Sequence, residues 1–159
     1  MKTYQVKAIL QQKGWLLNPF ITIDSKGKIT AIAERGISDE YIDGYVLPGF
    51  QNAHSHAFQY AMSGLAEIHT HRSRKDDFWA WRHAMYEVAL SVNPEQLESI
   101  AAMLYVEMLR NGYTSVAEFH YLHHDDQGLP YAHISELGER LVSAAKTAGI
   151  HITLIPIFY

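Results

Sequence analysis

The chain is most constrained by an alternation between strand-like and helix-like apolar spacing that occupies most of its length. Three short apolar runs, at residues 45–50, 114–119 and 150–158, have the length and β-branched content of strands. Two longer segments, at 93–112 and 134–148, repeat apolar residues with the period of a helix. Because strands that alternate with helices pair in parallel, this order predicts an α/β fold with a parallel sheet.

The segment 93–112 has the clearest local signals. Asn93 suits the N-cap, Pro94 suits the first helical position, and Gln96 can complete a capping box. One apolar stripe follows, made of Leu97, Ile100, Ala101, Leu104 and Met108, and Gly112 is expected to end the helix. Another helix is expected to begin near Phe78, in the aromatic-rich stretch before Asn93.

The first forty-odd residues have a different character. A strand is expected at 3–9 and a hairpin at 15–33, because Asp, Ser and Gly at 24–27 supply turn chemistry between β-branched runs. We therefore divide the chain into a β unit at 1–46 and an α/β unit at 47–159.

Composition excludes several classes of function. The formal net charge is −4, so the chain lacks the basic surface that nucleic acid requires. No apolar run is long enough to span a membrane, and the run near the start is broken by Gln11, Gln12 and Lys13 without a signal-peptide cleavage site. We therefore expect a cytoplasmic protein. With no cysteine and ten histidines, any metal site must use histidine and carboxylate ligands.

His54-Ser55-His56 is the candidate metal motif. Residues i and i+2 of a strand point to the same face, so the two imidazoles can hold one ion such as zinc. The motif follows an apolar run and Pro48-Gly49, where the site residues of parallel α/β folds gather. His54 and His56 are therefore predicted metal ligands, and the alternative is two unrelated loop histidines.

Other polar groups are weaker candidates. His69-Thr70-His71 has the same spacing, but the three basic residues that follow would repel a cation, so a solvated loop is expected. Glu118, at the end of the strand 114–119, is expected to orient a ligand histidine. Three histidines follow that strand: His120, His123 and His124. One of them can make a functional contact, and the alternative is that they lie on a mobile surface loop.

Several blocks of the sequence resemble the amidohydrolase superfamily. Leu47-Pro48-Gly49-Phe50-Gln51-Asn52-Ala53-His54-Ser55-His56 is similar to the first barrel strand of these enzymes. Three longer blocks resemble, more narrowly, the formimidoylglutamate deiminase family. These blocks lie within 54–67, 78–86 and 116–125. The resemblance covers essentially the whole chain, and the combined blocks are more specific than the two histidines alone.

This resemblance implies a fold and an activity. The fold would be the start of a (β/α)₈ TIM barrel, preceded by part of a small β-sandwich domain and truncated after the third barrel strand. The activity would be hydrolysis of N-formimidoyl-L-glutamate to N-formyl-L-glutamate and ammonia, in histidine degradation, with one zinc ion per subunit. Zinc generates a hydroxide nucleophile near neutral pH. A homodimer is also implied.

The resemblance also implies roles for five residues. His54 and His56 would bind zinc, and Gln59, Arg82 and Tyr121 would contact a small substrate with two carboxylates. A guanidinium can bind one carboxylate through paired hydrogen bonds, and a phenol or an amide can donate to another. Alternatively, Gln59 caps the helix after the strand, Arg82 pairs with an acidic neighbour, and Tyr121 packs on the barrel rim. Three aromatic residues are expected to pack rather than bind substrate: Trp79, Trp81 and Tyr86.

Known relatives are far longer and supply further zinc ligands and the acid–base residues from later strands. A catalytic zinc usually has three protein ligands, so this segment alone is expected to be inactive. Its general acid and base are expected beyond residue 159.

Three other functions stay open. The first is another aminohydrolase of the superfamily, such as a nucleobase or nucleoside deaminase or a chlorohydrolase. The second is a cupin-type metal-binding barrel, whose motif expects a glutamate where this chain has Gln59, Tyr60 and Ala61. The third is a non-catalytic truncated barrel that acts as a binding or scaffold protein.

Overall fold

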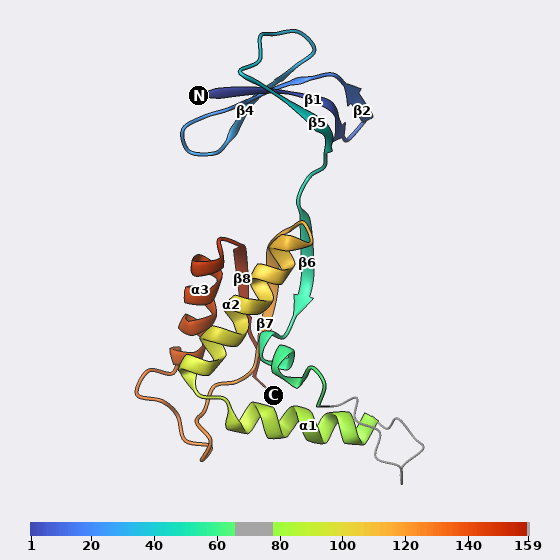
Figure 1. Cartoon of the computed structure of the whole chain (residues 1–159). Coiled ribbons are helices and arrows are strands. Elements are labelled where there is room, and N and C mark those ends of the chain that lie inside the picture. The colour runs from blue at the N-terminus through green and yellow to red at the C-terminus, as the bar shows by residue number, and fades with distance from the viewer. Residues whose placement is uncertain (66–77, 159) are drawn as a thin grey trace. The chain divides into compact units, whose positions relative to one another are not determined.

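The computed structural model describes residues 1–65 and 78–158. The chain divides into two compact units, Met1–Pro48 and Gly49–Tyr159, each with its own hydrophobic core (Figure 1). The core of the first unit is small and is built on Val6, Ile9 and Ile21.

The first unit is a five-stranded sheet in the order β2-β1-β3-β4, with β5 paired to β1. Its strands are β1 (Lys2–Gln11), β2 (Gly14–Leu17), β3 (Phe20–Ile23), β4 (Ile29–Ala33) and β5 (Glu40–Val46). β5 runs parallel to β1, and the other pairs are antiparallel. The expected hairpin over 15–33 forms only between β3 and β4, where the Asp24 carboxylate accepts two backbone hydrogen bonds. Residues 15–17 belong to β2, which pairs with β1 instead.

The second unit is built on a three-stranded parallel sheet in the order β6-β7-β8. The strands are β6 (Phe50–Ser55), β7 (Tyr113–His120) and β8 (His151–Pro156). Helix α2 (Pro94–Arg110) precedes β7 and helix α3 (Glu136–Ala148) precedes β8, and the two helices pack on each other and on the sheet (Figure 1). The predicted order of strand, helix, strand, helix, strand is confirmed, and the fold is mixed α/β.

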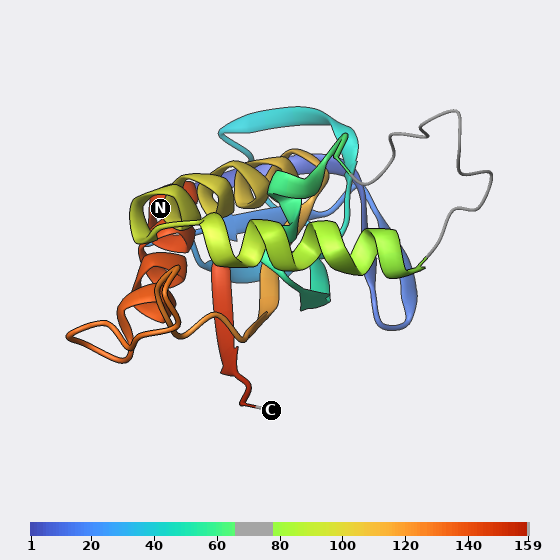
Figure 2. The same cartoon turned by 90° about the horizontal axis from the view of Figure 1, so that it is seen from below.

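Two further elements lie near the end of the sheet toward which β6 and β7 run. A short 3₁₀ helix, η1 (Ala57–Met62), follows β6 directly. Helix α1 (Phe78–Ser91) begins where the sequence predicts a helix and packs on η1 (Figures 1 and 2). The site residues described below come from this end of the second unit.

The strand that carries His54 begins later than the sequence predicts. The apolar run 45–50 is interrupted, because β5 ends at Val46 and β6 starts at Phe50. Proline has no N–H for a ladder, and Gly49 lies so close to Thr114 that an added Cβ would be 2.2 Å from its Oγ1. A continuous apolar run of this kind predicts a buried strand. Most of β6 is exposed, so that prediction is wrong.

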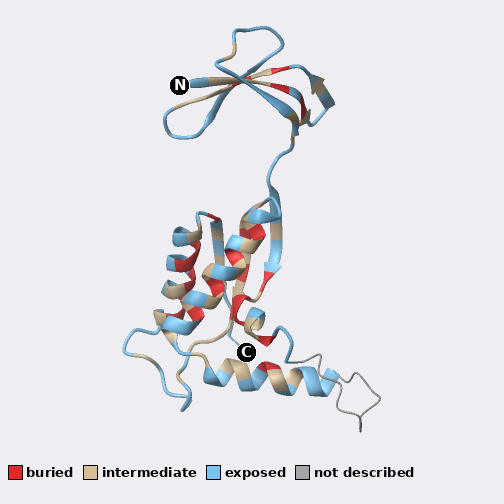
Figure 3. Ribbon diagram, viewed as in Figure 1, coloured by how far each residue is buried: buried red, intermediate tan, exposed pale blue. Residues whose placement is uncertain are grey.

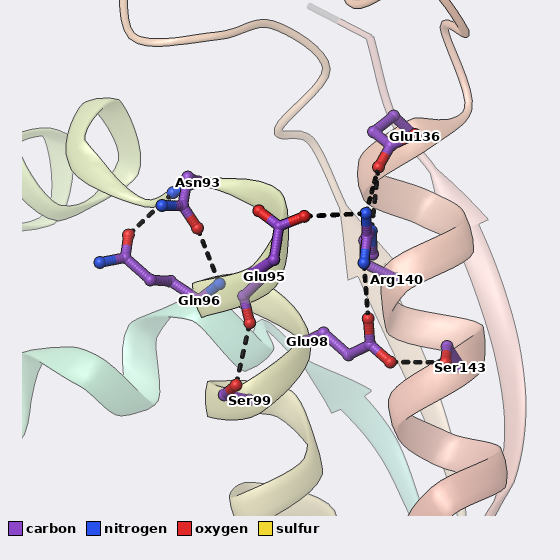
Figure 4. Close-up of polar contacts among 8 residues, drawn as sticks. All are labelled: Asn93, Glu95, Gln96, Glu98, Ser99, Glu136, Arg140 and Ser143. Carbon is purple, nitrogen blue, oxygen red and sulfur yellow. Dashed lines mark hydrogen bonds and ion pairs between the residues drawn. The ribbon is translucent and has the colours of Figure 1, made fainter.

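Helix α2 has the predicted N-terminal capping box. Asn93 Oδ1 accepts a hydrogen bond from the Gln96 backbone at 2.8 Å, and Gln96 Oε1 accepts one from the Asn93 backbone at 3.0 Å (Figure 4). The first turns of α2 are tied to α3 by the Arg140 guanidinium. It lies within 3.0 Å of three carboxylates, those of Glu95, Glu98 and Glu136 (Figure 4).

The main core lies between these two helices and the sheet. Figure 3 shows buried residues on α2 and α3 and along β7. Leu97, Tyr105 and Leu141 are among its largest fully enclosed side chains. None of the described helices is long and apolar enough to cross a membrane.

Candidate metal centre

His54 and His56 converge at the end of β6. Their Nε2 atoms are 2.9 Å apart, because the two rings leave the strand on the same side. Two imidazoles that bind one tetrahedral zinc ion at about 2.0–2.1 Å would have their nitrogens about 3.3 Å apart. The pair therefore fits two adjacent coordination positions of one metal ion.

Phe119 of β7 contacts both histidines. Its carbonyl oxygen lies 2.9 Å from His56 Nδ1, and its ring centroid lies 4.2 Å from that of His54. A carbonyl oxygen only accepts, so Nδ1 of His56 carries the proton and Nε2 presents its lone pair. Metal-binding histidines are commonly oriented by this kind of contact. The sequence analysis did not identify Phe119, since a backbone carbonyl carries no residue signal.

The described residues supply only two metal ligands at this point. Across 1–65 and 78–158, no group of three histidine, aspartate, glutamate or cysteine side chains is arranged to hold an ion. The expected solvated pair His69 and His71 lies outside these ranges. Since a catalytic zinc usually has three protein ligands, these two histidines alone do not make up a complete site of that kind.

Glu118 lies behind the histidine pair and is almost completely buried, with 1% of its surface exposed. Its carboxylate accepts hydrogen bonds from the backbone N–H of Ala57 and, at 3.1 Å, from the hydroxyl of Tyr105. Burial raises the pKa of Glu118 above its ordinary value, and these hydrogen bonds together with one from Ser55 oppose that rise. The position of Glu118 in the sequence predicts that it orients a ligand. It contacts the backbone beside His56.

Tyr105 is a residue that the sequence analysis missed. It is fully buried on the inner side of α2, and its hydroxyl donates to Glu118. Burial and the neighbouring carboxylate both raise the pKa of this phenol above its ordinary value. The available signal was its position four residues after Ala101 in the apolar stripe, because a buried tyrosine hydroxyl needs a hydrogen-bond partner.

Gln59 and Tyr121, two of the three expected substrate contacts, lie together beside His56. Gln59 Nε2 donates to the Tyr121 hydroxyl at 3.0 Å, and the rings of Tyr121 and His56 are 5.0 Å apart. A cavity of about 250 Å³ lies next to them. Its lining includes Tyr121, Met85, Tyr86, His123 and Asp125.

Arg82 has different surroundings. On α1 it donates to the Tyr86 hydroxyl at 3.3 Å and lies 5.6 and 5.4 Å from the ring centroids of Trp79 and Tyr86. Glu87, one of its possible acidic partners, pairs with His83. Among the nearby aromatic residues, Trp79 is 65% exposed, and its ring centroid lies 5.5 Å from that of Phe78. Tyr86 links Arg82 to the cavity, because it lines that cavity and accepts from the guanidinium.

His120 and His123 make more contacts than histidines of a surface loop would. His120 is buried, and burial followed by the neighbouring His123 lowers its pKa to about 4. His123 Nε2 lies 2.8 Å from the Ile157 carbonyl oxygen, and its ring stacks on Phe158 at 4.3 Å. His124 is exposed, as a loop histidine would be.

Comparison with known proteins places this arrangement in a class. A sequence model of the amidohydrolase family matches residues 45–156, and the chain belongs to that family. It is 47% identical over 152 residues to formimidoylglutamate deiminase of Pseudomonas aeruginosa, covering 94% of this chain and 33% of that protein.

Solved structures share the fold of this chain. The chain superposes on an amidohydrolase from Brucella melitensis with a TM-score of 0.88 and 45% identity, covering all of this chain and 35% of that one. It also superposes on atrazine chlorohydrolase of Arthrobacter aurescens complexed with zinc, with a TM-score of 0.75 and 21% identity. This superposition covers 98% of this chain and 35% of that one. The chain thus spans about a third of the length of these relatives.

Proposed function

We propose that this chain forms part of a metal-dependent deiminase that hydrolyses N-formimidoyl-L-glutamate to N-formyl-L-glutamate and ammonia. The observation that carries the proposal is the convergence of His54 and His56 Nε2 at 2.9 Å, with Gln59 and Tyr121 beside them. The 47% identity to a formimidoylglutamate deiminase supports this substrate over a nucleobase.

We also propose the architecture in which this site works. The three parallel strands would be the first of a (β/α)₈ barrel, with residues 47–159 in the barrel and residues 1–46 in a β-sandwich domain. In such barrels the site residues lie at the carboxyl ends of the strands, which is where His54, Glu118 and Phe119 lie. Assembly into a homodimer stays a prediction.

In the proposed mechanism, His54 and His56 would hold a zinc ion at the point where their Nε2 atoms converge. Zinc when bound supplies a nucleophile at neutral pH, because it lowers the pKa of water. The Phe119 carbonyl keeps the proton of His56 on Nδ1, away from the metal side. Since the described residues provide two ligands, we infer that they do not catalyse the reaction alone.

The substrate would be held by three side chains. The Gln59 amide and the Tyr121 hydroxyl already form a hydrogen-bonded pair beside the histidines and can both donate to one carboxylate. Arg82 would bind the other carboxylate through two parallel hydrogen bonds. Trp79 and Tyr86 lie near its guanidinium and restrict the Arg82 side chain before substrate binds. Arg82 therefore loses fewer conformations on binding.

Metal content and ammonia release test this proposal. The whole deiminase of which this chain would form part should contain zinc and release ammonia from N-formimidoyl-L-glutamate but not from guanine, whereas this chain alone should release none. His54→Ala and His56→Ala should each lose bound metal and activity. His133→Ala removes an exposed histidine elsewhere in the second unit and should change neither. Equal metal content in all four proteins would overturn the metal assignment, and ammonia release from guanine alone would favour the nucleobase deaminase.

A further inference from the structure

Glu118 is a buried carboxylate in a position that packing alone does not explain. Burying a charged group costs free energy, and replacing buried charges with apolar residues of similar size is often neutral or stabilising. Among the described residues only a few polar side chains are buried, and Glu118 is more completely enclosed than Ser55 or His120. The hydrogen-bond partners of the Glu118 carboxyl group therefore indicate its role.

Two consecutive residues of β7 hold the segment that carries the metal ligands. The Glu118 side chain accepts from the Ala57 backbone N–H, and the Phe119 backbone carbonyl accepts from His56 Nδ1. These contacts reach His56 from two directions, because the side chain of one residue and the carbonyl of the next project differently from the strand. His56 is thus fixed by its ring and by the peptide that follows it.

The second carboxylate oxygen of Glu118 is held from the other side. The Tyr105 hydroxyl donates to Oε2 at 3.1 Å, while Ala57 donates to Oε1, and the Ser55 side chain also hydrogen-bonds to the carboxylate. Glu118 therefore contacts the residues immediately before and after His56, and Tyr105 fixes the carboxylate from α2.

We propose that Glu118 is a positioning residue for the metal centre, acting through Ser55 and Ala57 to fix the His56 ring at the angle that binds the ion. This inference rests on the proposed metal site. Glu118 does not touch the substrate or the metal in this role. Tyr105 supports Glu118 but is one step further from the histidines.

Metal affinity, measured apart from activity, tests this role. We would measure zinc affinity of the full chain by competition with a chromophoric chelator, and the visible absorption bands of bound Co²⁺. Glu118→Gln keeps the size of the side chain but replaces one acceptor oxygen with a donor and removes the charge. It should weaken zinc binding roughly 10- to 100-fold, as loss of a partner behind the ligands typically does. The Co²⁺ bands should also shift.

Tyr105→Phe is the matched control, because it removes the hydrogen bond on the far oxygen and leaves the Ala57 contact intact. It should lower thermal stability while its zinc affinity stays within about 3-fold of wild type, less than the loss expected from a direct partner. Glu118→Asp keeps the charge but withdraws it by one methylene, so its affinity should fall between those of wild type and Glu118→Gln. It is also the variant to measure if Glu118→Gln does not fold.

The outcomes separate this inference from the proposed function. A wild-type protein that binds neither zinc nor Co²⁺ would overturn the metal site and the role of Glu118 with it. Wild-type binding with unchanged affinity and spectra in both Glu118 variants would overturn the positioning role alone. Equal losses in Tyr105→Phe and Glu118→Gln would also overturn it, since general loosening of the core would then account for the effect.

Discussion

His56 Nδ1 lies 2.9 Å from the backbone oxygen of Phe119, and this contact determines which ring nitrogen of His56 is protonated. His54 Nε2 lies equally close to His56 Nε2 on the other side of the ring. A neutral His56 that donates from Nδ1 can only accept at Nε2, so in the metal-free protein the shared proton must come from His54. A metal ion that binds both Nε2 atoms must displace it.

We therefore predict distinct tautomers for the two histidines. In chelator-treated protein at neutral pH, long-range ¹H–¹⁵N spectra should show His56 protonated at Nδ1 and His54 at Nε2. Addition of zinc should move the His54 proton to Nδ1 and leave His56 unchanged. The exposed His151 serves as the control and should not respond to zinc. An Nε2-protonated His56 in the presence of zinc would contradict the Phe119 contact.

Asn93 should stabilise the second unit more than Ser135, although both residues precede a helix. Asn93 caps α2 with its side chain, whereas the Ser135 side chain makes no capping bond to α3 and donates to Glu139 instead. Asn93→Ala should lower the free energy of unfolding by about 1 kcal/mol, the usual cost of a lost cap. Ser135→Ala, measured by the same urea denaturation, should cost less than half of that. Equal effects would mean that the capping geometry is not what stabilises α2.

The capped helix also shows why part of the fold could be predicted. Asn93, Pro94 and Gln96 are close together in the sequence, so their combination indicates the start of α2 without reference to the rest of the chain. The apolar periods of α2 and α3 are local in the same way. The run 45–50 misled because its apolar pattern is continuous, while in the structure β5 ends at Val46 and β6 begins only at Phe50, after Pro48 and Gly49.

The candidate site was predictable only in part, for the same reason. His54 and His56 are two residues apart, so an extended backbone is enough to place their rings on the same side. Gln59 and Tyr121 are separated by 62 residues, and their pairing came from family resemblance rather than from spacing. The bond between Tyr105 and Glu118 joins a helix to a strand, and only the folded chain shows which buried hydroxyl meets which carboxylate.

Gly49 should be intolerant of a side chain because of Thr114. An alanine Cβ would lie 2.2 Å from Oγ1, 2.3 Å from Cγ2 and 2.8 Å from Cβ of Thr114. Gly49→Ala should therefore lower the free energy of unfolding by about 1–3 kcal/mol, as overpacking does. In a Thr114→Ala background, where two of these three atoms are gone, the same substitution should cost less. Additive costs in this double-mutant cycle would show that the close contact is not the cause.

A control for Gly49 is available in the first unit. At Gly44 an added Cβ would meet only Ile42 Cγ2, at an ordinary 3.7 Å. Gly44→Ala should leave the free energy of unfolding within about 0.5 kcal/mol of wild type. A large loss of unfolding free energy in Gly44→Ala would mean that an added methyl group is destabilising even without a close contact. The contact with Thr114 would then not explain the effect at Gly49.

His120 should make the protein less stable in mild acid. Burial lowers its pKa to about 4 in the folded protein, against an ordinary value of 6.5. Above pH 6.5 the ring is neutral in both states and contributes nothing to the pH dependence. Between pH 6.5 and 4 the unfolded chain takes up a proton that the folded chain does not, so stability falls as the pH falls. The full loss corresponds to about 3 kcal/mol by pH 4.

The measurement is the free energy of unfolding of wild type and His120→Leu from pH 7.5 to 4. The wild-type curve should fall more steeply than the variant curve below pH 6.5, and the two should run parallel above it. His123 contacts the ring, and Glu139 and Lys146 line the same cavity; all three residues are kept in both proteins. His133→Leu, which removes an exposed histidine, should retain the wild-type slope. Parallel curves for wild type and His120→Leu throughout would mean that His120 titrates normally in the folded state, and the acid sensitivity would then have to arise elsewhere.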